Sequence, residues 1–275
     1  MPWIPQINRP SRDARIVHID TDPLKQQMPL WYIGSELAVQ ANAATALAQL
    51  HTALTVRRPD RVERRRRYLQ AAHEAWEGFV AAHERAQPEL TAPMLIAALR
   101  DAIGTEAIVV SESVTNFHVV PQHLRRTKPG TLFSSGGGSL GYNGGAAFGI
   151  KLAQPDSLVV AICGDGSYLF SQPSTVHWLA RAYQAPFLHV VLNNGGWRAP
   201  RQAVLSVHPD GIAAQAPNID IHFPDPPDYA AIAAAAGGAH PEIVRSVAEV
   251  KPALERALRA IRTERRSAVI DAHVK

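Results

Sequence analysis

The sequence has little cysteine, no long apolar run and no signal-like beginning. Cys163 is the only cysteine among 275 residues, which excludes an intramolecular disulfide and a cysteine-based zinc site. No segment approaches the roughly 20 consecutive apolar residues of a transmembrane helix, and the first residues lack the basic-then-apolar order of a signal peptide. We therefore expect a cytoplasmic protein that makes no contact with a membrane.

The sequence also lacks a large excess of positive or negative residues. The chain has 28 Lys and Arg residues against 24 Asp and Glu residues, a formal net charge of +4, and much of this excess lies in the arginine-rich run of residues 57–67. Without that run the balance is ordinary, so the chain as a whole has no nucleic-acid footprint. We interpret the run as the solvated face of a helix, with an anionic partner as the alternative.

The N-terminal third has the pattern of a domain remnant followed by a helix. Residues 14–20 predict a strand and residues 36–50 a helix, but a single unit of this kind cannot bury both faces of its strand. Residues 57–85 have the spacing of an amphipathic helix. The predicted apolar face of that helix comprises Val62, Leu69, Ala72, Trp76 and Phe79. A further helix is predicted from the N-cap Thr91 to Gly104.

Beyond residue 107 the pattern changes to short apolar runs that alternate with helices. Runs of this length, rich in β-branched residues and without polar alternation, are typical of strands buried on both faces of a parallel sheet. The predicted strands are 108–110, 158–162, 188–192 and 269–270, and the predicted helices are 144–152, 173–183, 229–236 and 250–262. We therefore expect an α/β domain, a three-layer sandwich with a mainly parallel sheet.

Four glycine-rich or polar segments are candidate binding loops, because open parallel sheets bind ligands at the carboxyl ends of their strands. Three of them follow predicted strands, namely residues 111–116, 164–167 and 193–197. The fourth is the glycine cluster of residues 136–141. That cluster matches G-x-G-x-x-G and would suit a dinucleotide-binding unit, but no clear apolar strand precedes it.

The segments around Asp165 and Asn194 complement each other chemically. Between Gly166 and Asn193 lie 26 residues, enough for one helix and one strand, so both loops return to the same edge of the sheet. Carboxylate and amide oxygens are hard ligands suited to Mg²⁺ or Ca²⁺, and glycines allow backbone N–H groups to approach a phosphate. This pairing favours a site for a divalent cation and a diphosphate.

Gly-Asp-Gly followed after this interval by Asn-Asn resembles the signature of thiamine diphosphate-dependent enzymes. The text from Gly138 to Gly149 and from Pro155 to Ser167 is similar to the diphosphate-binding domain of the acetolactate synthase, benzoylformate decarboxylase and 2-hydroxyacyl-CoA lyase group. The resemblance covers roughly residues 90 to 275. It implies residues 1–52 as the last βα unit of a central domain, 53–89 as a helical linker and 90–275 as the cofactor-binding domain.

The resemblance also implies a role for each loop. Asp165, the Asn194 side chain and the carbonyl of Gly196 would bind Mg²⁺. Thr115, Gly164, Gly166 and Ser167 would surround the diphosphate. Leu140 would bend the cofactor into a V, and the Gly138 carbonyl would accept a hydrogen bond from its 4'-amino group. The reaction chemistry would then belong to thiamine diphosphate itself.

Such enzymes bind thiamine diphosphate between two domains, and nothing in this sequence resembles the other, the pyrimidine domain. The resemblance therefore implies a component of a 2-oxo acid decarboxylase, carboligase or lyase that needs a pyrimidine domain in another chain or upstream. We expect a small-molecule 2-oxo acid or 2-hydroxyacyl substrate, a dimeric or tetrameric assembly, and no flavin or nucleic acid. The alternatives are a non-catalytic cofactor-binding regulatory module and a Rossmann-type nucleotide-binding protein.

Several other polar residues are better explained by packing. His118, His123, His177 and His189 have no metal-ligand spacing with one another. Cys163 has the position of a small core residue at the end of a strand, and Glu112 is interpreted as structural rather than as a base. For Trp197 and Arg198, loop packing and a place near the substrate remain equal alternatives.

Overall fold

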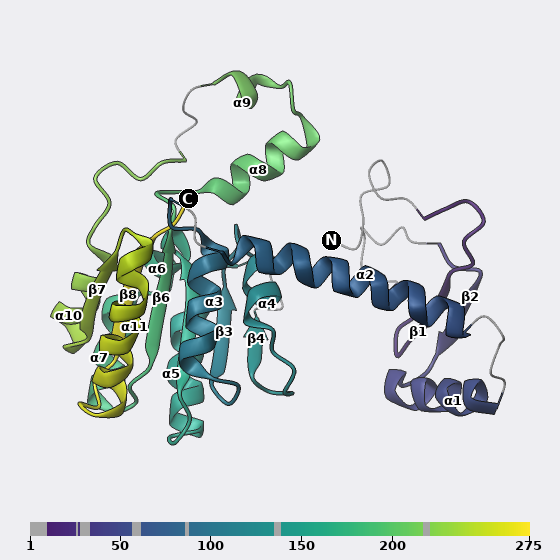
Figure 1. Cartoon of the computed structure of the whole chain (residues 1–275), viewed down its shortest axis with the longest axis horizontal. Coiled ribbons are helices and arrows are strands. Elements are labelled where there is room, and N and C mark those ends of the chain that lie inside the picture. The colour runs from purple at the N-terminus through teal and green to yellow at the C-terminus, as the bar shows by residue number, and fades with distance from the viewer. Residues whose placement is uncertain are drawn as a thin grey trace. The chain divides into compact units, whose positions relative to one another are not determined.

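The structure of the chain is a computed structural model. It describes residues 10–25, 27, 34–56, 62–85, 88–134, 139–216 and 221–275. The chain divides into two compact units, residues 1–74 and 75–275 (Figure 1). Within the described ranges, no helix combines the length and the apolar character that crossing a membrane requires.

The first unit contains a small parallel sheet, where the prediction was partly wrong. Strands β1 (Val17–Asp20) and β2 (Leu37–Gln40) pair in parallel, and helix α1 (Ala43–Val56) follows. The predicted helix over 36–50 therefore begins as a strand. Its true start is set by Asn42, whose Oδ1 accepts hydrogen bonds from the backbone N–H groups of Ala44 and Thr45, as an N-cap side chain does.

The predicted amphipathic helix is present as α2 (Val62–His83), but its apolar face is largely exposed. Leu69 and Phe79 are 56% and 58% exposed, and Val80 is the helix's one buried residue. Residues 57–61, the start of the arginine-rich run, lie outside the described residues. The periodicity predicted which face is apolar, but periodicity carries no information about what covers that face.

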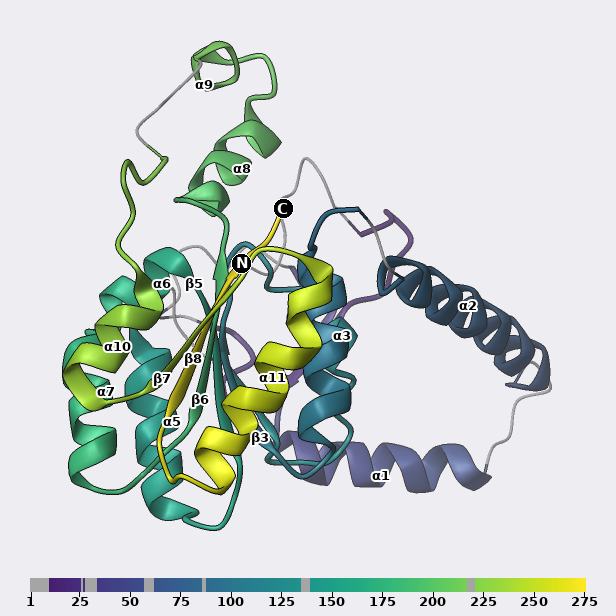
Figure 2. The ribbon, with the colours of Figure 1, turned by 60° about the vertical axis from the view of Figure 1, so that its left-hand side comes forward.

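The second unit is built on a six-stranded sheet in the order β4-β3-β5-β6-β8-β7, in which all neighbouring strands are parallel (Figure 2). Its strands are β3 (Ile108–Glu112), β4 (Leu132–Ser134), β5 (Val159–Gly164), β6 (Leu188–Asn193), β7 (His240–Val244) and β8 (Ala268–His273). This arrangement confirms the predicted α/β fold class and its mainly parallel sheet.

The two strands that the sequence did not predict lie at the two edges of this sheet. β4 has three residues, and β7 contains His240, Pro241 and Glu242 in place of an apolar run. Edge strands pair on one side only and tolerate polar residues and proline, so they lack the signal of a buried strand. The sequence shows no clear apolar strand immediately before the glycine cluster, yet the short edge strand β4 precedes it and ends at Ser134.

Helices cover both faces of the sheet and make three layers (Figure 2). One face is covered by α3 (Ala92–Ile103), α4 (Val119–Leu124) and α11 (Val247–Arg262), and the other by α5 (Tyr142–Ala153), α7 (Pro173–Ala182) and α10 (Tyr229–Gly237). The helices α4, α6 (Asp165–Phe170), α8 (Arg198–Val207) and α9 (Ile212–Gln215) were not predicted. Two helices, α6 and α7, thus occupy the interval predicted to hold one.

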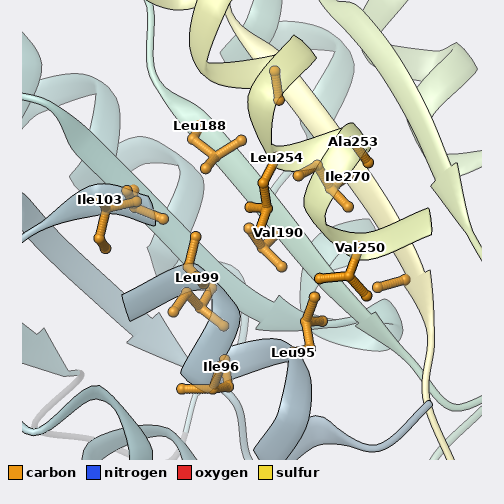
Figure 3. Close-up of a cluster of buried hydrophobic side chains, with 14 of the residues drawn as sticks. Leu95, Ile96, Leu99, Ile103, Leu188, Val190, Val250, Ala253, Leu254 and Ile270 are labelled. Atoms are coloured by element: carbon orange, nitrogen blue, oxygen red, sulfur yellow. The ribbon is translucent and has the colours of Figure 1, made fainter. Parts of the chain in front are cut away.

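The central strands supply side chains to both layers, which explains their unbroken apolar sequences. Leu188 and Val190 of β6 belong to the larger core cluster together with Leu99 of α3 and Leu254 of α11 (Figure 3). On the opposite face, Val191 belongs to the cluster under α10. A third cluster lies under α5 and α7, and burial of apolar area in all three, at about 25 cal/mol per Å², stabilises this unit.

His177 of α7 lies in the core on the α5 side of the sheet. Its side chain is 1% exposed and stacks on Phe187 with ring centroids 5.3 Å apart. Neither ring nitrogen has a hydrogen-bond partner among the described residues. Burial without a partner disfavours the charged ring and lowers the pKa of His177 to about 4.

This burial predicts a loss of stability at acid pH. An unfolded histidine has a pKa of about 6.5, so between that pH and about 4 the unfolded chain binds more protons than the folded one. From this group alone, the free energy of unfolding should be about 2 kcal/mol lower at about pH 5 than at about pH 7. Urea unfolding of the wild type and of His177→Phe at both pH values measures this difference. The free energy of unfolding should fall less in the variant than in the wild type. Equal falls would show that His177 does not cause the pH dependence.

Candidate functional site

Four segments of the second unit meet in one pocket of about 220 Å³ at the carboxyl ends of the strands. Its walls come from the segments after β3, β5 and β6 and from Leu140, which precedes α5. The lining residues are Ser113, Val114, Thr115, Asn116, Leu140, Gly164, Asp165, Gly166, Ser167, Asn194, Gly196, Trp197, Arg198, Ala199 and Pro200. The pocket is smaller than the usual small-molecule site, which encloses about 300 to 1,000 Å³.

The structure brings most of the predicted site residues together in this pocket. Thr115, Leu140, Gly164, Asp165, Gly166, Ser167, Asn194 and Gly196 all line it. Gly138 lies outside the described residues. The sheet order explains the convergence, because β3, β5 and β6 are neighbours and parallel strands end at a common edge.

The carboxyl group of Asp165 ties two of these segments together. Its Oδ1 accepts from the N–H of Gly166 at 2.8 Å, while Oδ2 accepts from the N–H groups of Gly195 at 2.8 Å and Gly196 at 2.9 Å. The residue is 2% exposed, and burial raises the pKa of Asp165 although these amides oppose the rise. The carboxyl oxygens therefore hold the segment after β6 against the start of α6.

Asn194 contributes an oxygen that has no partner. Its Oδ1 is buried and accepts no hydrogen bond from any described residue. A buried, unsatisfied amide oxygen is costly in isolation, and it is a suitable ligand for a hard cation. No group of three or more His, Cys, Asp or Glu side chains within the described ranges is placed to hold a metal. Mg²⁺ at this position would need backbone and ligand oxygens as well, the mixed set that it commonly takes.

Two close approaches of the chain explain glycines of the pocket. A Cβ atom on Gly166 would lie 2.0 Å from Cζ3 of Trp197, so the indole ring packs directly on this glycine. Gly196 has φ of +150°, and a Cβ there would lie 1.9 Å from the carbonyl oxygen of Ile221. Gly164 is different, because a Cβ atom at this residue would meet nothing within 4 Å, so no close contact requires a glycine there.

The segment around Ile221 is part of the site's support, which the sequence did not predict. The N–H of Trp197 donates to the carbonyl oxygen of Ile221, and the N–H of Phe223 donates to that of Gly195. Trp197 also makes edge-to-face contacts with Phe170 and Phe223. The indole therefore both lines the pocket and packs the loop, and no turn or strand signal in the sequence marks residues 221–223.

Glu112 holds the turn that presents Leu140. Its Oε1 accepts from the N–H of Gly141 at 2.5 Å, and its Oε2 accepts from the backbone N–H and the Nδ2 of Asn143 at 2.8 and 3.0 Å. Gly141 has φ of +99° and no room for a Cβ, which would lie 2.4 Å from the carbonyl oxygen of Phe170. These contacts are structural, as expected of Glu112 from the sequence.

The comparisons with known proteins agree on the class. Residues 113–272, more than half of the chain, match the family described as thiamine pyrophosphate enzyme, C-terminal TPP binding domain. Thiamine pyrophosphate is another name for thiamine diphosphate. The chain belongs to this family, and the matched residues include every segment that forms the pocket.

Individual relatives are decarboxylases and transferases. The chain is 36% identical over 117 residues to benzoylformate decarboxylase from Pseudomonas aeruginosa, covering 42% of this chain and 22% of the relative. It is 25% identical over 281 residues to sulfoacetaldehyde acetyltransferase from Castellaniella defragrans, covering 94% of this chain and 45% of the relative. The chain thus spans less than half the length of either curated relative.

A solved structure has the same fold. The thiamine diphosphate-dependent 4-hydroxybenzoylformate decarboxylase of Rhodococcus jostii RHA1 superposes with a TM-score of 0.59 at 25% sequence identity. The match covers 70% of this chain and 34% of that structure. The shared part therefore amounts to about one third of the solved enzyme.

The contact between Trp197 and Gly166 generates a prediction with a control in the same motif. Gly166→Ala should force the indole away and lower the free energy of unfolding by about 1–3 kcal/mol, the usual cost of overpacking. Gly164→Ala, which meets no atom within 4 Å, should change it far less. Urea unfolding and near-ultraviolet circular dichroism measure both effects. Equal costs for the two variants would show that the indole does not rest on Gly166.

Proposed function

We propose that this chain supplies the diphosphate and Mg²⁺ side of the cofactor site in a 2-oxo acid decarboxylase, carboligase or lyase that uses thiamine diphosphate. The observation that carries the proposal is the convergence of Asp165, Asn194 and Leu140 from separate segments in one pocket within the family's matched region. When bound, thiamine diphosphate supplies the carbanion chemistry of such reactions. The chain's own residues bind it, orient it and exclude water.

The charges of the pocket support a divalent cation. Asp165 is the one acidic side chain and Arg198 the one basic side chain among the described residues that line the pocket. A diphosphate beside the buried Asp165 carboxyl group would place like charges together. Mg²⁺ held by Asp165, the free oxygen of Asn194 and the carbonyl of Gly196 would offset that repulsion.

The remaining lining residues suit an anionic ligand. Ser167 is 4% exposed, and it lines the pocket. Its hydroxyl group, the neighbouring Thr115 and the backbone at Gly164 and Gly166 offer donors to a diphosphate. Leu140 also lines the pocket, where its side chain would support the ring system of the cofactor. The resemblance assigns the acceptor of the 4'-amino group to the carbonyl of Gly138, which lies outside the described residues.

The size of the pocket supports a cofactor site that a second domain completes. A volume of about 220 Å³ suits part of a cofactor, and the matched relatives extend well beyond the region shared with this chain. We infer that a pyrimidine domain, in another chain or upstream, completes the site, and that the assembly is a dimer or tetramer. We also infer the domain boundaries 1–52, 53–89 and 90–275, and a small 2-oxo acid or 2-hydroxyacyl substrate.

Asp165 provides the main test of the binding site. Calorimetric titration of thiamine diphosphate into the chain should give binding that requires MgCl₂, and Asp165→Ala should weaken it by at least about 100-fold, because a metal ligand and the link between two loops are lost together. The exposed Asp156→Ala serves as a matched carboxylate control with unchanged affinity.

The same titration is repeated with a pyrimidine-domain chain present. Absence of Mg²⁺-dependent binding under both conditions would refute the proposal. Binding without CO₂ release from pyruvate or benzoylformate, in the presence of that partner, would instead identify a non-catalytic cofactor-binding module.

Leu140 separates cofactor orientation from cofactor binding. Leu140→Ala removes a lining side chain but no polar ligand, so the affinity for thiamine diphosphate should change by less than about tenfold. In the assembly with a pyrimidine domain, exchange of the C2 proton for deuterium should slow by on the order of tenfold to 100-fold, because the reacting groups are less well oriented. Proton NMR after acid quench measures this exchange, and an unchanged rate would remove Leu140 from the proposed role.

A further inference from the structure

A chain of buried polar contacts continues from Glu112 into the core beneath the pocket. Asn143 of α5, which donates to Glu112 through Nδ2, has its Oδ1 2.7 Å from Nε2 of His189 in β6. The Sγ atom of Cys163 lies 3.3 Å from the same His189 nitrogen. Glu112, Asn143, Cys163 and His189 are all between 0% and 4% exposed, so water does not compete for these contacts.

The order of donors along this chain is determined by its ends. The carboxyl group of Glu112 accepts, so the amide of Asn143 presents Nδ2 to Glu112 and Oδ1 to His189. Nε2 of His189 must then carry the proton and donate to that oxygen. Burial lowers the pKa of His189, which keeps the ring neutral with Nδ1 unprotonated.

The other end of the chain reaches the pocket. The N–H of Gly141 that donates to Glu112 belongs to the Leu140–Gly141 peptide, and Leu140 lines the pocket. Without the side-chain contact from Asn143, Glu112 would keep only its two backbone donors, the N–H groups of Gly141 and Asn143, and its carboxyl group would be held less firmly. The orientation of this peptide therefore depends on side chains that do not themselves line the pocket.

We propose that Asn143 and His189 are positioning residues: the contact from His189 to Asn143 fixes Glu112, and Glu112 fixes the Leu140–Gly141 peptide at the wall of the pocket. The consequence for cofactor affinity rests on the proposed function, whereas the position of the peptide does not. None of the three side chains touches the pocket, so each acts through the next.

A matched control is available in the same core. His177 is 1% exposed, and its ring centroid lies 5.6 Å from that of His189, yet no described residue is hydrogen-bonded to its ring. A general disturbance of packing should follow substitution of either histidine. Only substitution of His189 should change the position of the Leu140–Gly141 peptide.

The peptide can be observed directly by NMR. Leu140–Gly141 is the only Leu-Gly pair in the sequence, so labelling with carbonyl-¹³C leucine and ¹⁵N glycine gives a single cross-peak in an HNCO spectrum. In the ligand-free chain His189→Leu should move the Gly141 amide proton upfield by several linewidths, because a short hydrogen bond to a carboxyl group is weakened. His189→Gln, which keeps a donor near the position of Nε2, should restore most of the shift, and His177→Phe should leave it unchanged.

Thiamine diphosphate titration in the presence of MgCl₂ gives the second readout. His189→Leu should weaken the affinity by about three- to tenfold, the loss expected from one buried neutral hydrogen bond, and His189→Gln should recover it. If His189→Leu does not fold, Asn143→Ser removes the same link and should move the Gly141 resonance in the same direction.

The outcomes separate this proposal from the proposed function. An unchanged Gly141 resonance in His189→Leu, or an equal shift in His177→Phe, overturns the positioning role whether or not the chain binds the cofactor. A shifted resonance with unchanged affinity overturns the step from the peptide to the cofactor. Failure of the wild type to bind thiamine diphosphate contradicts the proposed function alone, because the amide result needs no ligand.

Discussion

The pocket depends on the buried carboxyl group of Asp165, which accepts hydrogen bonds from three backbone N–H groups. Asp165 stands where β5 gives way to α6, and its oxygens reach the amides of Gly195 and Gly196 on the neighbouring segment. These hydrogen bonds hold the start of α6 against the segment that follows β6, just beyond the point where β5 and β6 pair. Because the loops are in place before any ligand arrives, little binding energy has to be spent on ordering them.

The sequence predicted the centre of the fold better than its edges. β5 and β6 are buried on both faces, and that burial leaves an unbroken apolar run that is visible in the sequence. β7 lies at an edge, pairs only with β8 and contains a proline, so its own residues do not have the pattern of a buried strand. The same reason applies to α2, where the spacing identifies an apolar face but the covering surface is not encoded in that spacing.

In the pocket, the residues that could be predicted from the sequence are those whose positions follow from the topology of the sheet. The nearness of Asp165 and Asn194 follows from the rule that parallel strands end at one edge, together with the interval between the two motifs. The support from Ile221 and the contact between Asn143 and His189 follow from no such rule. They join residues from different elements through single side chains or short backbone pairings, and single residues of this kind leave no periodic or composition signal in a lone sequence.

The sole cysteine gains a use from its position. Cys163 is fully buried in β5, with helices over the face of the sheet on which it meets His189. A thiol reagent can therefore reach it only when the central sheet opens, and fraying of loops or chain ends does not expose it. The native chain consequently carries its own reporter of global unfolding: the rate at which Cys163 is alkylated measures opening of the whole domain, with no competing thiol elsewhere in the sequence.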